Sequence, residues 1–417
     1  MSEFHVIGGN RLEGELTVQG AKNSVLPILA ACLLSRRPVT VRNCPALTDV
    51  EAALAILTHL GCEVRREGDA VWVDPSAGDG TDIPDRLMRA MRSSVIFLGP
   101  VLARSGRVRL THPGGCELGS RPIDLHLAAV RALGGRVEEG PAGLCCEGRL
   151  TGADIQLALP SVGATENALL AALGAEGTTT ITNAAREPEI TDLQNFVNVL
   201  GARVRGAGSP VITVEGGRPL TGGTYTVMGD RIVAATLMAA TAAAGGRVSL
   251  RGVDHRHVAP VSAVLAEAGC RVTHDSHRVE LTRDTRRPLR LRGTVRTAPH
   301  PGFPTDAQAP VMAALAAGFG SVLFVENIFD SRYRHVPELA RMGADITAEG
   351  RVALVRGVPR LHGAAVEAAD LRGGAALAVA ALGAEGESVI TGLRHIDRGY
   401  AALESMIQQL GGRMIRR

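Results

Sequence analysis

One short signature recurs six times along the chain and constrains the fold more than any other feature. In each copy a glycine follows an apolar residue and precedes a small, a charged and another apolar residue, as in Leu60-Gly61-Cys62-Glu63-Val64. A left-handed glycine at such a place closes a helix, and a strand follows. The intervals are 73, 67, 68, 74 and 68 residues, between Gly61, Gly134, Gly201, Gly269, Gly343 and Gly411. This near-constant spacing predicts six structural repeats.

A short alternating strand precedes each of these glycines. Such strands are expected at residues 38–41, 107–110, 178–181, 247–250, 321–324 and 387–390. Before each lies a helix rich in Ala and Leu, such as residues 375–382, which has no continuous polar face and must be buried all round. The repeat is therefore predicted to be a strand, a buried helix, a strand, an amphipathic helix and a strand.

Six such repeats predict an α/β (α+β) protein of two domains, because 417 residues exceed one ordinary core. Three repeats that bury their first helices together, with the sheets outside, form an inside-out α/β barrel. The Gly- and Pro-rich segment 216–223 divides the third repeat from the fourth, so the halves meet near residue 230. A continuous solenoid of six repeats is the alternative.

Composition excludes several classes of partner. A net charge of +3 and 3% aromatic residues offer little to the phosphates and bases of a nucleic acid. The longest apolar stretch, residues 232–244, is shorter than the ~18–20 residues of a membrane span, and the first residues do not resemble a signal peptide. Seven irregularly spaced cysteines without a CxxC pair indicate neither zinc nor a disulfide framework. We expect a cytoplasmic protein with no nucleic-acid or membrane partner.

Lys22 is the only lysine among the 45 Lys and Arg residues. Its compact, strongly hydrated ammonium differs from a planar guanidinium, so either chance or a specific task explains it.

Charged and amide side chains gather at the expected starts of the buried helices. Because the N-terminus of a helix attracts anions, these positions favour an anionic substrate, although ordinary helix caps and surface charges would look the same. The residues are Lys22, Asn23, Arg92, Thr165, Glu166, Asn167, Asp230, Arg231, Asp306 and Arg372.

Two loops add candidate reactive groups. The glycine-rich segment 113–122 holds Cys116 between small residues, with Arg121 near enough to tune its acidity, so we interpret it as a functional thiol. The proline-rich segment 296–306 leads to Asp306, which is either a general base or a helix cap. No P-loop or dinucleotide-binding motif follows an expected strand, so no cofactor and no metal are predicted.

Several long motifs, in order, resemble the UDP-N-acetylglucosamine 1-carboxyvinyltransferase (enolpyruvyltransferase) family. They are residues 20–24, 113–116 with 121–126, 160–167, 297–306 and 395–399, and the resemblance runs from about residue 4 to the C-terminus. It implies two inside-out α/β barrels that close on a sugar nucleotide. It also implies domains of residues 1–20 with 231–417, and of residues 21–230.

The resemblance implies a reaction and a role for each motif residue. The enolpyruvyl group of phosphoenolpyruvate moves to the 3-hydroxyl of UDP-N-acetylglucosamine and phosphate leaves, in the first committed step of peptidoglycan synthesis. Cys116 would protonate the donor methylene and be alkylated by fosfomycin, and Asp306 would be the base. Lys22, Arg121 and Arg398 would bind the phosphate, and Arg332 and Arg372 the carboxylate. The acceptor would contact Asn23, Arg121, Pro122, Ile123, Asp124, Leu125, Ser161, Val162, Gly163, Ile328 and Phe329, and Arg92 and Asp370 also match motif positions.

Two departures from the family pattern bear on the site. Leu159-Pro160 stand where some members carry a lysine on the diphosphate side, and Gly373-Gly374 are expected to loosen the carboxylate site. We expect a monomer. The alternatives are a 5-enolpyruvylshikimate-3-phosphate synthase-like transferase and a non-catalytic paralogue that binds UDP-sugars.

Overall fold

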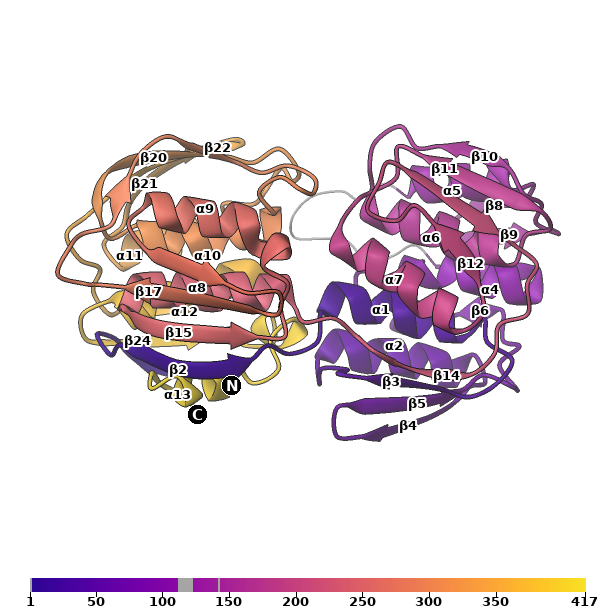
Figure 1. The fold of residues 1–417 in the computed structure, drawn as a ribbon, viewed down its shortest axis with the longest axis horizontal. Helices are drawn as coiled ribbons and strands as arrows, with labels where there is room; N and C mark the ends of the chain where they lie inside the picture. Colours follow the sequence, from indigo (N-terminus) through magenta and orange to yellow (C-terminus); the bar gives the residue numbers. More distant parts are fainter. Residues whose placement is uncertain (1, 112–122, 142) are drawn as a thin grey trace. The chain divides into compact units, whose positions relative to one another are not determined.

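The computed structural model describes residues 2–111, 123–141 and 143–417, which form two compact units (Figure 1). One unit contains residues 2–19 and 229–417, and the other lies within residues 20–228. The family resemblance implies that the chain passes from one domain to the other near residues 21 and 230. Cys116, Arg121 and Pro122 lie outside the described residues.

Each of the six sheets combines parallel with antiparallel pairing of strands, as in the order β10-β11-β13-β12. In the second, third, fifth and sixth repeats the parallel pairing is made by the strands before and after the buried helix, whereas in the first and fourth repeats β14 and β2 supply the parallel partner. The predicted class, a two-domain α/β fold of repeated units, is confirmed. The predicted repeat was one strand short, because the strand after each glycine turns back as a hairpin or, in the last repeat, pairs with a distant strand.

The glycine signature has the predicted conformation. All six glycines have positive φ, from 84° at Gly411 to 107° at Gly269. A side chain with a Cβ is strained there, so each glycine ends its helix and turns the chain into the next strand.

Three repeats form the unit within residues 20–228. The first contains α1 (Lys22–Cys32), β3 (Val39–Arg42), α2 (Thr48–His59), β4 (Glu63–Glu67) and β5 (Ala70–Asp74). The second contains β6 (Asp82–Ile83), α3 (Asp85–Met88), η1 (Ser94–Phe97), α4 (Leu98–Ser105), β7 (Arg107–Leu110), α5 (Asp124–Ala132), β8 (Arg136–Gly140) and β9 (Gly143–Glu147). The third contains β10 (Asp154–Gln156), α6 (Val162–Leu173), β11 (Thr178–Thr182), α7 (Pro188–Val199), β12 (Arg203–Arg205), β13 (Val211–Glu215) and then β14 (Gly223–Thr226).

The other unit has the same plan and begins with β1 (Phe4–Ile7) and β2 (Leu12–Thr17). The fourth repeat contains α8 (Arg231–Ala244), β15 (Gly246–Arg251), η2 (His255–Val258), α9 (Ala259–Glu267), β16 (Arg271–His274) and β17 (Arg278–Arg283). The fifth contains β18 (Arg290–Leu291), β19 (Thr294–Arg296), α10 (Thr305–Leu315), β20 (Phe319–Val325), α11 (Val336–Arg341), β21 (Asp345–Glu349) and β22 (Val352–Arg356). The sixth contains β23 (Ala365–Glu367), α12 (Leu371–Gly383), β24 (Glu387–Thr391), η3 (Ile396–Arg398), α13 (Leu403–Gln409) and β25 (Arg413–Arg416).

Buried helices form the centre of each unit. Thirteen of the 14 residues of α8 are buried, and α8, α10 and α12 pack against one another. In the other unit α4 packs on α6, and α1 packs on η1, which leads directly into α4. Ala is the commonest residue in α6, α8, α10 and α12, which allows close approach. This arrangement confirms that the Ala- and Leu-rich segments are buried all round.

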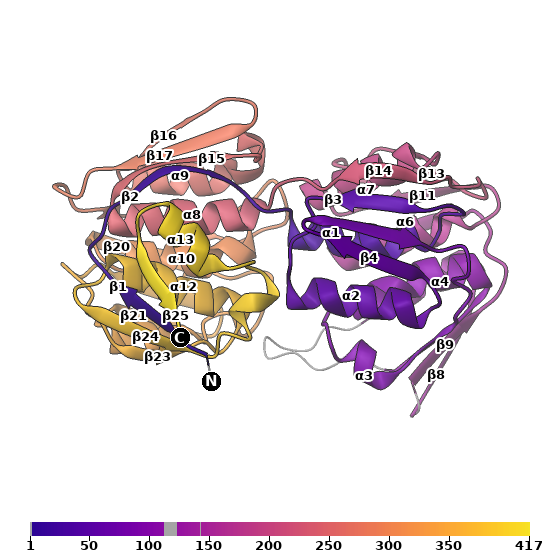
Figure 2. The ribbon, with the colours of Figure 1, turned by 90° about the horizontal axis from the view of Figure 1, so that it is seen from below.

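Three strands pair with partners from distant parts of the chain. β14 pairs in parallel with β3 of the first repeat, and β2 pairs in parallel with β15 of the fourth. β1 lies between β24 and β25, so Phe4 is opposite both Ile390 and Arg416. Figure 2 shows β1 beside these C-terminal strands. Each unit is thus completed by strands that are remote in sequence.

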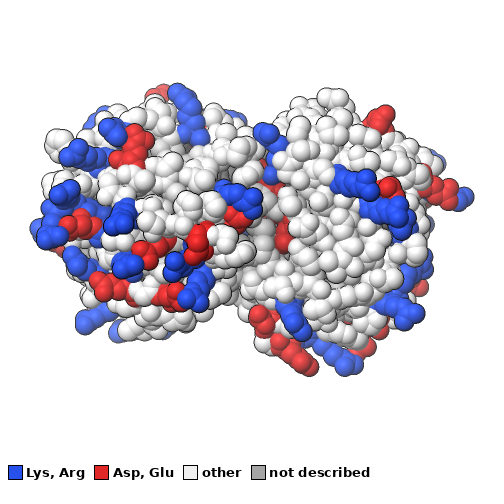
Figure 3. Space-filling view, viewed as in Figure 1, with Lys and Arg blue, Asp and Glu red and all other residues white. Residues whose placement is uncertain are grey.

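Charge is interspersed over the face of the α9, β15 and β17 unit in Figure 3. Ion pairs such as Arg247–Glu280 at 3.0 Å and Arg251–Glu15 at 2.7 Å are solvent-exposed, and such pairs contribute little to stability. Within the described ranges, no helix is long and apolar enough to cross a membrane. Over the same residues, His, Cys, Asp and Glu side chains form no group of three that could hold a metal.

Candidate active site

Asp306 lies between two buried arginines at the start of α10. Nη2 of Arg332 donates to Oδ1 of Asp306 at 2.5 Å, and Nη2 of Arg372 donates to Oδ2 at 2.7 Å. The arginine side chains are 3% and 4% exposed, whereas that of Asp306 is 25% exposed. Two cations from separate segments therefore hold one carboxylate, one oxygen each, and the carboxylate is the member that solvent reaches.

The arginines determine the acidity of Asp306. Burial alone would raise its pKa, but the charges of Arg372 and Arg332 and their hydrogen bonds outweigh burial and hold the pKa well below the usual range. For Arg372, burial lowers the pKa, but the charges of Asp306, Tyr400 and Asp230 together with the hydrogen bond to Asp306 outweigh burial and raise it. Asp306 and Arg372 therefore remain ionised together.

Arg332 is also held by contacts other than Asp306. Its Nε and Nη2 donate to the carbonyl oxygen of Thr305 at 3.3 and 3.1 Å. Its guanidinium lies 5.3 Å from the centre of the Phe329 ring, within the range of a cation–π contact. The cation is therefore anchored to the backbone at the start of α10.

A fully buried carboxylate, Glu326, organises the segments around Arg332. It accepts hydrogen bonds from the hydroxyls of Thr297 and Thr305 at 3.0 and 2.9 Å, and from the backbone N–H groups of Ile328 and Phe329 at 2.8 and 3.1 Å. It thereby joins the proline-rich approach, the first turn of α10 and the 328–329 segment. Sequence reasoning missed Glu326, whose one local signal is a charged residue directly after a buried strand.

Arg372 is fixed at the start of α12. Asp370 caps this helix, because its Oδ1 accepts from the backbone N–H of Arg372 at 3.0 Å and of Gly373 at 2.9 Å. Nη1 of Arg372 donates to the hydroxyl of Tyr400 at 3.4 Å, and that hydroxyl shares a 2.9 Å hydrogen bond with Thr236 of α8. Tyr400 and Thr236 are also absent from the sequence prediction, since neither motif nor spacing distinguishes them.

The expectation that Gly373-Gly374 loosen the site is wrong. Both glycines are buried inside α12. A Cβ at Gly374 would lie 2.7 Å from Cγ1 of Ile396, and one at Gly373 would lie 2.8 Å from Oδ2 of Asp370 and 3.1 Å from Cβ of His335. The glycine pair therefore lets α12 pack closely around the arginine.

Lys22 and Asn23 lie in the other unit, at the start of α1. Nζ of Lys22 is 2.7 Å from Oδ2 of Asp49 on α2, and both residues are buried. Asn23 is half-buried. The next residue, Ser24, donates to Asp192 of α7, which fixes this helix start.

Asp192 also reaches β14 and the segment that follows it. It accepts from the hydroxyl of Tyr225 at 2.5 Å and from the backbone N–H of Met228 at 3.3 Å. The start of α1 and the segment that leads out of this unit are thus held by one carboxylate.

Six of the residues predicted to contact the acceptor lie at two adjoining helix starts. Ile123 precedes α5, and Asp124 and Leu125 lie in its first turn. Ser161 caps α6 by accepting from the N–H of Ala164 at 3.4 Å, and Val162 and Gly163 begin that helix. A Cβ at Gly163 would lie 3.2 Å from the His126 ring, so the helices touch here. The prediction that Thr165, Glu166 and Asn167 lie just before the buried helix is wrong, because α6 already begins at Val162 and contains all three.

A buried hydrogen-bond network holds these two helices in place. The amide of Asn167 donates to Nδ1 of His126 at 2.7 Å and to the carbonyl of Val95 at 3.0 Å, and it accepts from the N–H of Gly99 at 2.8 Å. Because an amide nitrogen only donates, Nδ1 of His126 is the acceptor and the ring is neutral. Burial lowers the pKa of His126 to about 4.

The remaining predicted residues are less tightly grouped. Arg92 is half-buried just before η1, and Arg398 is half-buried at the end of η3. Ile328 is exposed and Phe329 half-buried. The structure thus joins Asp306, Arg332 and Arg372 directly, and it joins residues 123–125 to 161–163 through α5 and α6.

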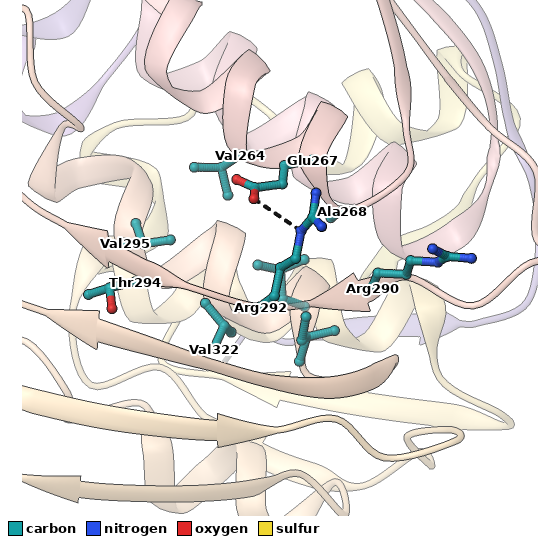
Figure 4. Close-up of a pocket in the computed structure, with 10 residues that line it drawn as sticks. Val264, Glu267, Ala268, Arg290, Arg292, Thr294, Val295 and Val322 are labelled. Carbon is teal, nitrogen blue, oxygen red and sulfur yellow. Dashed lines mark ion pairs between the residues drawn. The ribbon is translucent and has the colours of Figure 1, made fainter.

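None of these residues lines the small cavity between α9 and the strands β18 and β19 (Figure 4). Its volume is about 50 Å³, its walls include Val264, Val295 and Val322, and an Arg292–Glu267 ion pair of 3.1 Å crosses it. A space of this size holds only a few water molecules, so it is not a substrate site.

Comparisons with known proteins agree over the whole length. A family model described as EPSP synthase (3-phosphoshikimate 1-carboxyvinyltransferase) matches residues 6–407. The chain is 46% identical to UDP-N-acetylglucosamine 1-carboxyvinyltransferase 2 of Caldanaerobacter subterraneus subsp. tengcongensis, with 100% of both chains covered. It is 44% identical to UDP-N-acetylglucosamine 1-carboxyvinyltransferase of Acinetobacter baylyi, again with 100% of both covered.

Solved structures show the same fold. The enolpyruvyl transferase NikO from Streptomyces tendae has a TM-score of 0.89 and 26% identity, over 100% of this chain and 99% of that one. EPSP synthase from Acinetobacter baumannii is similar in fold, with a TM-score of 0.75 at 18% identity over 100% of both chains.

Proposed function

The chain belongs to the UDP-N-acetylglucosamine 1-carboxyvinyltransferase family and is an enolpyruvyl transferase, and from this premise we propose that it transfers the enolpyruvyl group of phosphoenolpyruvate to the 3-hydroxyl of UDP-N-acetylglucosamine. Phosphate is released. The reaction is the first committed step of peptidoglycan synthesis and takes place in the cytoplasm.

The buried arginine pair around Asp306 carries this proposal. Arg332 and Arg372 offer separate N–H groups to the two oxygens of one carboxylate, which is how a donor carboxylate is bound strongly and in one orientation. Asp306 lies where it contacts both, so a bound donor would sit beside a potential base.

In the addition step, the 3-hydroxyl oxygen of the sugar forms a bond to C2 of phosphoenolpyruvate. Asp306 accepts the hydroxyl proton, and the Cys116 thiol donates a proton to the C3 methylene, which becomes a methyl group. In the elimination step the Cys116 thiolate takes a proton from this methyl group, the C2–C3 double bond forms again, and the bond from C2 to the phosphate oxygen breaks. The proton held by Asp306 goes to the leaving phosphate. This role of Cys116 requires a thiol whose pKa lies near the working pH, so that it can both donate and accept a proton.

The other predicted residues bind the substrates. Lys22, Arg121 and Arg398 bind the donor phosphate and stabilise the charge that develops as it leaves. Asn23 contacts the sugar, and the starts of α5 and α6, with residues 121–125 and 161–163, bind the uridine diphosphate through helix N-termini. Ile328 and Phe329 cover the nucleotide.

The test is release of phosphate from purified protein mixed with phosphoenolpyruvate and UDP-N-acetylglucosamine. We expect release that fosfomycin abolishes, and a Cys116→Ser variant that still binds UDP-N-acetylglucosamine but neither turns over nor reacts with fosfomycin. Release only with shikimate 3-phosphate as the acceptor would favour the synthase named in the matching family model. Tight binding of the sugar nucleotide by folded protein without turnover would contradict the proposal.

A further inference from the structure

The arginine pair of the candidate site already holds a carboxylate, and that carboxylate belongs to the protein. Arg332 and Arg372 each bind one oxygen of Asp306, at 2.5 and 2.7 Å. A donor carboxylate bound between the same two guanidinium groups would need the same N–H groups. Asp306 and the donor would therefore compete for one site.

The arginines have anchors that do not depend on Asp306. Arg332 donates to the backbone oxygen of Thr305, and the backbone of Arg372 is fixed by the Asp370 cap while its Nη1 reaches Tyr400. If the Asp306 side chain turned away, both guanidinium groups would keep these contacts. The carboxylate site is thus preorganised and would remain for another carboxylate.

Asp306 is also the member of the cluster that can leave. Its side chain is 25% exposed, whereas the two arginine side chains are 3% and 4% exposed. It lies in the first turn of α10, and it does not cap that helix, since the cap residue Pro304 offers no side-chain hydrogen bond and none from Asp306 is found there. Rotation of the aspartate side chain therefore costs its two arginine contacts and leaves the described helix cap unchanged.

We propose that Asp306 occupies the carboxylate site of the donor in the substrate-free enzyme and is displaced from it when phosphoenolpyruvate binds. This inference rests on the proposed function and adds a control step to it. While Asp306 is paired with both arginines it is too weakly basic to take a proton. The donor carboxylate takes over the arginines and so releases Asp306 as the base, only when the donor is in place to react.

The charges around the pair support this order of events. The arginines hold the pKa of Asp306 well below its usual range, with Asp230 and Tyr400 acting on Arg372 from the neighbouring segments. His335 packs near Asp370 and remains neutral, because burial lowers its pKa to about 4. Of these groups, Asp306 is the carboxylate that hydrogen-bonds to both guanidinium groups.

The experiment compares equilibrium binding of phosphoenolpyruvate to the full-length protein and to an Asp306→Asn variant, by calorimetry without acceptor. Asparagine has the shape of aspartate but no charge, so it competes weakly for the arginines. We expect the variant to bind phosphoenolpyruvate at least about tenfold more tightly, equivalent to about 1.4 kcal/mol, although it should lose turnover. Gain of affinity with loss of activity separates a displaced competitor from a residue that only helps to bind the donor.

Asp370→Asn is the matched control. It removes the same charge from a neighbouring buried acid whose Oδ1 contacts the backbone of Arg372 rather than its guanidinium. We expect at most about a threefold change in affinity for this variant, less than half a decade on the affinity scale. An equal gain in both variants would show a general electrostatic effect and overturn the inference.

Pyruvate, a carboxylate without the phosphate, keeps the inference testable apart from the proposed function. Weaker binding, with the same preference for Asp306→Asn, is expected. If phosphoenolpyruvate binds neither protein but pyruvate prefers the variant, the proposed donor is wrong and the competition stands. If neither ligand prefers a folded Asp306→Asn variant, the competition is refuted whatever the donor is.

Discussion

Replacing Asp49 with asparagine removes a counter-ion from the chain's only lysine. Nζ of Lys22 lies 2.7 Å from Oδ2 of Asp49, and the two residues are 8% and 1% exposed. Because both partners are buried, solvent does not screen this pair as it screens surface ion pairs. Loss of one partner of a buried pair deprives the other charge of a counter-ion and costs about 3–5 kcal/mol. For a unit of this size, that corresponds to a melting temperature lower by roughly 6–20 °C.

Urea and thermal unfolding followed by tryptophan fluorescence measure this cost. Trp72, the single tryptophan, lies on β5 of the same unit as the pair, so its signal reports on that unit. A double-mutant cycle with Lys22→Met provides the control, because removal of both charges leaves neither one uncompensated. We expect the double variant to be more stable than Asp49→Asn alone. A loss below about 1 kcal/mol for Asp49→Asn, or additive effects of the two changes, would refute the reasoning.

Three further predictions concern the site. Lys22→Arg should keep the charge and the fold but lower turnover about 100-fold in the phosphate-release assay, because the larger planar guanidinium misplaces the donor. Full activity of this variant would show that the site does not require a lysine at position 22. Tyr400→Phe should raise the KM for phosphoenolpyruvate roughly 2- to 10-fold, since Arg372 loses one hydrogen bond, and an unchanged KM would show that Tyr400 does not position it. Buried His126 should lower the free energy of unfolding by about 2 kcal/mol between pH 7 and pH 5. In the unfolded state this histidine protonates near pH 6.5, whereas in the folded state its pKa is about 4 and it stays neutral. Tryptophan-monitored unfolding of His126→Gln should lack this part of the pH dependence, and an equal dependence in that variant would contradict the assignment.

Local physical rules account for the parts of the fold that the sequence predicts. The six glycines need a left-handed conformation, and the Ala-rich helices lack a polar face, so both are recognisable residue by residue. The second strand of each hairpin, such as β5 or β22, is missing from the prediction although its burial alternates, because the recurring glycine signature marks only the first strand. The pairing of β14 with β3, and of β2 with β15, depends on contacts across most of a unit and has no local signal.

The candidate site is likewise predictable from the sequence only in part. Asp306 and Arg372 are recognisable because each lies at the start of a buried helix. Their pairing is not, since these two residues are 66 positions apart and meet only because α10 packs on α12. The supporting groups Glu326 and Tyr400 are chosen by their three-dimensional neighbours, so sequence position alone does not distinguish them.

The position of β1 between β24 and β25 has a consequence for synthesis on the ribosome. Ile7 pairs with Glu387, so β1 waits for a partner that is translated 380 residues later. At about 5–20 residues per second this delay is roughly 20–80 s. The unit within residues 20–228 has all its strands once β14 has emerged, whereas Phe4 and Val6 remain without their sheet until β24 and β25 have been translated. The unit that is begun first is therefore completed last.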